Sequence, residues 1–104
     1  MAQFDVYANP NQATNRTIPY LLDVQADLLS DLATRVVVPL YAATAATKAA
    51  QHLNPRFQVK RTSVIMSTAE LAGVPLSALG DRVDSWQHHR SEIIAALDFL
   101  ISGF

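Results

Sequence analysis

The residues that most often carry out chemistry are few in this chain and poorly spaced for it. The histidines are His52, His88 and His89, and adjacent residues of a helix point about 100° apart, so His88 and His89 cannot bind one metal ion together. A zinc site needs further ligands at suitable spacing, and the chain has no cysteine. The serines and threonines lack a nucleophile elbow, and the three glycines form no phosphate-binding loop. We therefore expect no metal, no cofactor and no catalytic residue.

Three carboxylates, those of Asp23, Asp27 and Asp31, are spaced by four residues. On a helix they would share one face, where they could attract a divalent cation. The intervening Leu28-Leu29 and the strand-like residues before them argue against a ligand cage, so we expect a solvated acidic loop. Two adjacent leucines in a polar loop cannot both easily face one core, which makes the leucine pair the more informative feature.

Arg56, Lys60 and Arg61 form a modest basic cluster. One interpretation is a solvated strand edge, where charged side chains, lysine above all, protect against edge-to-edge aggregation. The other interpretation is a contact with an acidic partner or with RNA. The sequence leaves both open.

The last residues are apolar for the tip of a chain. A helix that buries one face presents polar residues on the other, but Phe99, Leu100, Ile101 and Phe104 lie around most of the circumference. Either the terminus docks into its own core, or part of it contacts another chain, as apolar patches rimmed by charge often do.

The elements that must position these residues are mostly short strands. Alternating or β-branched apolar residues predict strands within residues 4–7, 19–25, 36–38, 56–61 and 64–66. Pro39 is expected to close the third of these, because proline cannot donate a hydrogen bond to a neighbouring strand. The segment from Ala42 to Leu53 is rich in alanine but has a weak apolar face, so it is expected to be a short helix or a helical loop.

The end of the chain changes to a helical period. Apolar residues recur from Val83 to Ile101 at spacings that fit one face of a helix. Asp84 or Ser85 could cap its start, and Gly103 stands where helices often end. Strands followed by one helix predict an α+β fold, with a small antiparallel, barrel-like sheet and one C-terminal α-helix.

Length and composition limit the class of protein. A chain of 104 residues, half of them hydrophobic and 16% charged, is expected to form one domain over residues 1–104. Its formal net charge of -1 argues against bulk electrostatic binding to nucleic acid. The longest apolar run, from Val36 to Ala43, is too short to span a bilayer, and the first basic residue is Arg16. We expect no membrane segment and a cytoplasmic location.

Several segments, taken in order, resemble those of a known family: Gln3-Phe4-Asp5-Val6-Tyr7, Leu22-Asp23-Val24-Gln25-Ala26-Asp27-Leu28-Leu29, Arg35-Val36-Val37-Val38-Pro39-Leu40, Leu53-Asn54-Pro55, Val74-Pro75-Leu76 and Gly80-Asp81-Arg82-Val83. The second is the most specific, since it is similar to a Val-Asp-Val-Gln-Ser-Asp run followed by two aliphatic residues. The chain resembles the CcdB family, the toxins of CcdA–CcdB toxin–antitoxin modules. The resemblance covers nearly the whole chain.

This resemblance implies a small β-barrel-like sheet with a C-terminal helix, related to the MazF and Kid toxins, and a two-fold homodimer. It implies a protein that is not an enzyme but a poison of bacterial DNA gyrase. The dimer lodges between the two A subunits, holds the cleavage intermediate open and blocks religation. No direct contact with nucleic acid or membrane is implied.

The resemblance also assigns residues. The gyrase-facing positions are Leu28, Leu29, Asp98, Ser102, Gly103 and Phe104. The best-known member of the family has a tryptophan where this chain has Ser102, and a serine cannot stack on a gyrase arginine as an indole does. A CcdA-like antitoxin is expected to fold a disordered C-terminal segment on the toxin, with basic residues opposite Asp23, Asp27 and Asp31.

Two other functions remain open. An endoribonuclease of the MazF or Kid type would share the fold, and its acid–base chemistry would have to draw on Arg56, Arg61 and His52. A degenerate toxin that only binds its antitoxin is the second.

Overall fold

The computed structural model describes residues 2–44 and 53–103, which form an α+β fold. Within them the strands are β1 (Asp5–Ala8), β2 (Tyr20–Asp23), β3 (Thr34–Ala42), β4 (Arg56–Val59), β5 (Thr62–Met66), β6 (Ala72–Pro75) and β7 (Arg82–Ser85). Four short 3-10 helices, η1 (Asp27–Leu29), η2 (Thr68–Glu70), η3 (Leu76–Ala78) and η4 (Gln87–His89), precede the C-terminal helix α1 (Arg90–Ser102). The helix or helical loop expected from Ala42 to Leu53 lies largely outside the described residues.

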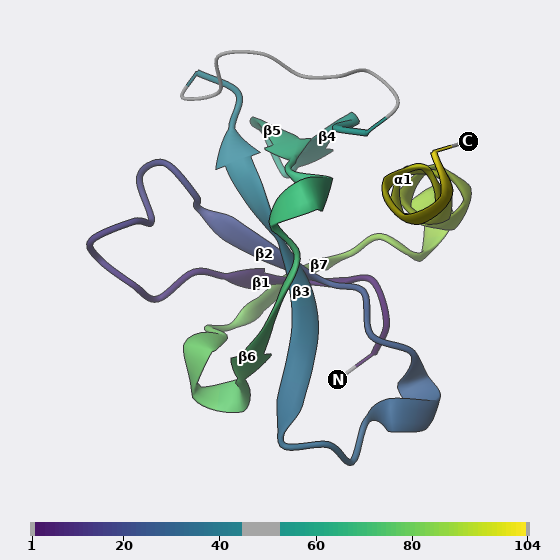
Figure 1. Cartoon of the computed structure of the whole chain (residues 1–104). Coiled ribbons are helices and arrows are strands. Elements are labelled where there is room, and N and C mark those ends of the chain that lie inside the picture. The colour runs from purple at the N-terminus through teal and green to yellow at the C-terminus, as the bar shows by residue number, and fades with distance from the viewer. Residues whose placement is uncertain (1, 45–52, 104) are drawn as a thin grey trace.

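The strands form one curled antiparallel sheet in the order β4-β5-β3-β2-β1-β7, and β6 pairs with β3 (Figure 1). Helix α1 lies on the same side of the molecule as β4. The prediction of a barrel-like antiparallel sheet followed by one C-terminal helix is confirmed. None of the described helices is both long and apolar enough to cross a membrane.

Strand β3 is nine residues long and organises the sheet. It pairs with β2 along one side and with β6 and then β5 along the other. The expectation that Pro39 closes this strand is wrong, because β3 continues to Ala42. The carbonyl of Pro39 accepts a hydrogen bond from Ser67 N at 3.1 Å, at the point where β3 passes from β6 to β5. No neighbouring strand requires a donor there, so proline is tolerated.

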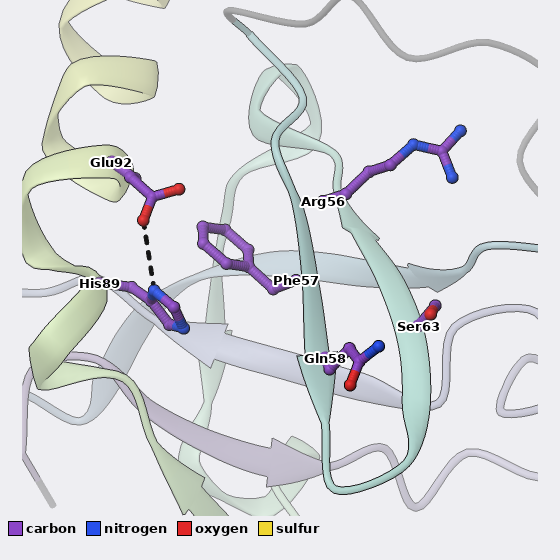
Figure 2. Close-up of a pocket in the computed structure, with 6 residues that line it drawn as sticks. All are labelled: Arg56, Phe57, Gln58, Ser63, His89 and Glu92. Carbon is purple, nitrogen blue, oxygen red and sulfur yellow. Dashed lines mark hydrogen bonds and ion pairs between the residues drawn. The ribbon is translucent and has the colours of Figure 1, made fainter.

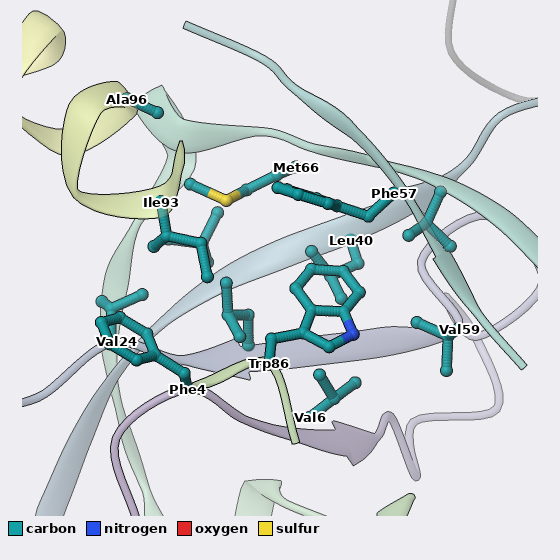
Figure 3. Close-up of a cluster of buried hydrophobic side chains, with 13 residues drawn as sticks. Phe4, Val6, Val24, Leu40, Phe57, Val59, Met66, Trp86, Ile93 and Ala96 are labelled. Atoms are coloured by element: carbon teal, nitrogen blue, oxygen red, sulfur yellow. The ribbon is translucent and has the colours of Figure 1, made fainter. Parts of the chain in front are cut away.

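The hydrophobic core fills the concave side of the sheet, and α1 closes it (Figure 3). Trp86 is fully buried, and its ring centroid lies 4.6 Å from that of Phe57. Ile93 and Ala96 are the buried residues of the helix. The alternation predicted for β4 is confirmed, since Phe57 and Val59 are buried in the core.

Helix α1 begins later than its apolar period predicts. Residues 82–85 form β7, which pairs with β1 and places Asp84 opposite Val6. The prediction that Asp84 or Ser85 caps the helix is therefore wrong, and Asp84 instead accepts hydrogen bonds from Ser85 N and from Trp86 Nε1. The predicted end is confirmed, because Gly103 has a φ of 76° and its N–H donates to the Phe99 carbonyl.

Candidate functional site

The leucine loop, residues 24–33, joins β2 to β3 and carries η1. Leu28 is 94% exposed, and Leu29 and Leu32 are 47% and 51% exposed. One exposed leucine is ordinary on a protein surface, but here three within five residues of one loop are exposed. The leucine pair therefore does not serve the core, in agreement with the expectation from its polar neighbours.

Asp23 does not belong to a solvated acidic loop. Its side chain is fully buried, and Oδ2 lies 2.6 Å from Arg35 Nη2 and accepts a hydrogen bond from Arg35 Nε at 2.9 Å. Burial raises the pKa of Asp23 more than the hydrogen bonds from Arg35 and from Gln25 N lower it. The expectation of a solvated carboxylate is wrong for Asp23, which holds the base of the leucine loop from inside the protein.

Gln25 holds the leucine loop in place. Its side-chain Nε2 donates to the Leu29 carbonyl at 2.8 Å, and its Oε1 accepts the Val36 N–H at 2.9 Å. One buried amide thus joins the exposed leucines to strand β3. Neither motif nor spacing in the sequence indicates a role for Gln25 or Arg35. The available signal was an arginine beside three valines of a buried strand, since such a charge requires a partner.

Asp27 and Asp31 are exposed, unlike Asp23. Asp27 Oδ1 accepts the Gln3 N–H at 2.7 Å, which ties the N-terminal segment to η1. Both carboxylates lie on the leucine loop, so this loop presents apolar side chains and negative charge together.

The last turns of α1 present a second exposed surface. Asp98, Ser102 and Gly103 are exposed there, and Ile101 is 79% exposed. Phe104 lies outside the described residues. Figure 1 shows this end of α1 well apart from η1. In one chain the candidate gyrase-facing positions therefore fall on two separate surfaces.

A groove of about 420 Å³ lies between β4 and the start of α1 (Figure 2). We call it the β4 groove, and its lining residues are Arg56, Phe57, Gln58, Ser63, His89 and Glu92. His89 Nδ1 lies 3.3 Å from Glu92 Oε1. The Arg56 side chain points away from this pair, on the other side of β4. The basic cluster in the sequence singled out Arg56, but nothing in the sequence predicted that His89 and Glu92 would line the same groove.

The rings of His88 and His89 lie close together, with centroids 4.1 Å apart, although adjacent residues of a helix were expected to point about 100° apart. His89 also packs against Phe57 and Trp86, at 4.6 and 5.7 Å. Its ring is therefore part of the aromatic packing under α1. In the described part of the chain, no group of three or more histidine or acidic side chains is placed to hold a metal ion.

The sequence model of the CcdB family, described as CcdB protein, matches residues 3–103. The chain belongs to the CcdB family. The resemblance carried by its ordered segments is confirmed, and the CcdB chain is a toxin of the toxin–antitoxin class.

A solved structure with a similar fold is an endoribonuclease in complex with its cognate antitoxin from a mycobacterial species. The CcdB chain matches it with a TM-score of 0.74, over 97% of this chain and 94% of that chain, at 15% sequence identity. At this identity the likeness shows a shared fold.

Proposed function

We propose that this chain poisons DNA gyrase by binding its A subunit as a homodimer and trapping the gyrase–DNA cleavage complex. The observation that carries the proposal is the exposure of Leu28 and Ile101, at 94% and 79%, on a member of the CcdB family. Side chains so exposed contribute little to the stability of the chain itself. They are the kind of apolar anchor that a partner buries.

Poisoning of this kind requires binding and no bond chemistry from the toxin. A ligand that binds one conformational state more tightly shifts the population toward that state. A toxin bound to the open cleavage complex therefore delays religation and blocks replication. Because gyrase acts on the chromosome, this function places the toxin in the cytoplasm.

The proposed gyrase-facing residues are Leu28, Leu29, Asp98, Ser102, Gly103 and Phe104. Those within the described residues lie on the leucine loop and at the C-terminal end of α1. A two-fold dimer uses each of these surfaces twice, which suits a target with two A subunits.

A CcdA-like antitoxin is the proposed neutralising partner. The solved endoribonuclease of similar fold is in complex with its own antitoxin, which supports a partner of this class. Asp27 and Asp31 are the exposed carboxylates that would receive basic antitoxin residues, whereas Asp23 would act from within by holding the loop.

A gyrase cleavage assay tests the proposal. Purified toxin is incubated with gyrase from its own host, supercoiled DNA and ATP, and linear DNA is measured after denaturation. The intact chain should accumulate cleaved DNA, and a variant lacking Ser102 to Phe104 should not. Unchanged gyrase turnover with the intact, folded chain would reject the proposal.

A MazF- or Kid-type endoribonuclease is the alternative, and the shared fold is the observation in its favour. Of its candidate residues, His52 lies outside the described residues, and Arg56 points away from the His89–Glu92 pair. Specific cleavage of RNA by the purified chain would support this alternative. Antitoxin binding with neither activity would identify a degenerate toxin.

A further inference from the structure

Within residues 2–44 and 53–103, the outer edge of β4 has no partner strand. β4 ends the sheet there and pairs with β5. The Met66 N–H donates to the Pro55 carbonyl at 3.0 Å, so these two residues form a hydrogen-bonded pair of the antiparallel ladder. Hydrogen-bonded pairs recur at every second residue, so the next ones are Phe57↔Val64 and Val59↔Thr62. The backbone N–H and C=O groups of Phe57 and Val59 therefore face β5. The N–H and C=O groups of Arg56 and Gln58 therefore point away from the sheet. They have no hydrogen-bond partner among the described residues.

This open edge forms one wall of the β4 groove. The opposite wall is the start of α1, with His89 and Glu92 paired to each other. Exposed edges are normally covered or protected, because their unpaired backbone groups accept a further strand. A groove of about 420 Å³ beside the edge leaves room for such a strand.

The charges of the β4–β5 hairpin are basic, whereas Glu92 on the opposite wall of the groove lies 3.3 Å from His89 Nδ1. Arg56, Lys60 and Arg61 are exposed on the β4–β5 hairpin, and none of them forms an ion pair within residues 2–44 and 53–103. Two copies of this chain paired through β4 would bring these like charges together, which disfavours a second copy as the occupant. An RNA backbone does not offer the alternating donors and acceptors that the edge requires.

We propose that an acidic, extended segment of the antitoxin adds a strand to β4 and lies in the β4 groove. Backbone hydrogen bonds to Arg56 and Gln58 would hold the segment, and the positive charge of the hairpin would attract its carboxylates. The inference rests on the antitoxin partnership proposed above but not on gyrase as the target. It adds a second antitoxin contact of opposite charge to the one at Asp27 and Asp31.

Amide hydrogen exchange, followed by NMR on the full chain with and without the antitoxin of its own module, tests the inference. Strand addition should slow exchange of the Arg56 and Gln58 amides at least about tenfold, and leave the already bonded amides of Phe57 and Val59 unchanged. Unchanged exchange at Arg56 and Gln58 in a saturated complex would overturn it. Protection of the same amides by an RNA oligonucleotide, or by raised toxin concentration alone, would also overturn it.

Two pairs of variants give a second readout. Gln58→Pro removes only an outward-facing donor and should weaken antitoxin binding about three- to tenfold, whereas Gln58→Ala keeps the N–H and should bind normally. Arg56→Glu should weaken binding, and Arg16→Glu, at an exposed site in the β1–β2 connection, should not. Equal affinities within each pair, for folded proteins, would contradict the inference. Gyrase poisoning should be unchanged in all four variants. A failure of the gyrase proposal can therefore be distinguished from a failure of this inference.

Discussion

The carboxylate of Asp23 lies 2.6 Å from Arg35 Nη2, and neither side chain is exposed to solvent. Arg35 stands two residues from Val37, which is directly opposite Asp23, so both side chains lie on the same face of the sheet. Arg35 Nη1 is buried with no hydrogen-bond partner among the described residues. The two charges therefore balance each other at the place where the leucine loop leaves the sheet.

Breaking this pair from one side should destabilise the protein severely. Arg35→Met leaves the buried Asp23 carboxylate without its partner, and we expect the free energy of unfolding to fall by about 3–5 kcal/mol in urea titrations. The double variant Asp23→Leu/Arg35→Met removes both charges of the pair and should lose less than the sum of the two single variants. Strictly additive losses would show that the two residues do not act as a pair.

Gln25→Ala should loosen the leucine loop through a substitution at a buried position. The Leu29 carbonyl and the Val36 N–H lose their partner, so we expect a loss of about 1–3 kcal/mol in stability and faster hydrogen exchange at the Val36 amide. Gln25→Glu keeps the acceptor for Val36 but not the donor to Leu29. Its Val36 amide should therefore stay protected, and exchange as fast as in Gln25→Ala would contradict the assigned contact.

Leu28→Ser should separate function from folding. Because Leu28 is 94% exposed, its replacement should change the free energy of unfolding by less than about 0.5 kcal/mol. If it is an anchor for gyrase, the toxin concentration needed for half-maximal DNA cleavage should rise about tenfold. Leu76→Ser, in η3 and also exposed at 46%, is the matched control and should poison normally. Equal potency of the two variants would remove Leu28 from the proposed contact.

The antitoxin complex should be sensitive to salt. Exposed charge pairs are screened as ionic strength rises, so affinity should fall between 50 mM and 500 mM salt, roughly from a Debye length of 14 Å to one of 4 Å. The double variant Asp27→Asn/Asp31→Asn should bind more weakly and show a shallower salt dependence. An affinity that does not change with salt would argue against these carboxylates as antitoxin contacts.

Tyr7 should make the protein sensitive to alkali. Burial, with the nearby Asp5 and Asp23 charges, raises the pKa of Tyr7 to about 12 from 10.0. Between these values the unfolded chain releases the phenolic proton and the folded chain keeps it, so stability is lost as pH rises from 10 to 12, by up to about 3 kcal/mol.

The difference between the wild type and Tyr7→Phe isolates this contribution, because every other titrating group is common to both. The variant should lose less stability than the wild type between pH 10 and pH 12 in urea titrations. Identical alkaline profiles would mean that Tyr7 ionises equally well in the folded chain.

The local sequence pattern was enough to predict several structural elements. The alternation around Phe57 and Val59 predicted a strand with those two residues inside, since the period of two is a property of the strand alone. Gly103 predicted the end of α1, because helices often end at a residue in the left-handed backbone conformation and glycine adopts that conformation without strain. The polar neighbours of Leu28 and Leu29 predicted that the pair would not be buried together.

By itself, then, the sequence determined the α+β class and the exposure of the leucine pair, because each depends on residues near one another in the chain. It also determined the family, because ordered segments along nearly the whole chain carry the resemblance. The tertiary structure alone decided that residues 82–85 form a strand, since they pair with β1, which lies far away near the start of the chain. It also decided that Asp23 is buried while Asp27 and Asp31 are exposed. The same residue type and spacing cannot distinguish them, because only the packing of β2 against β3 and the loop places an arginine beside one of the three.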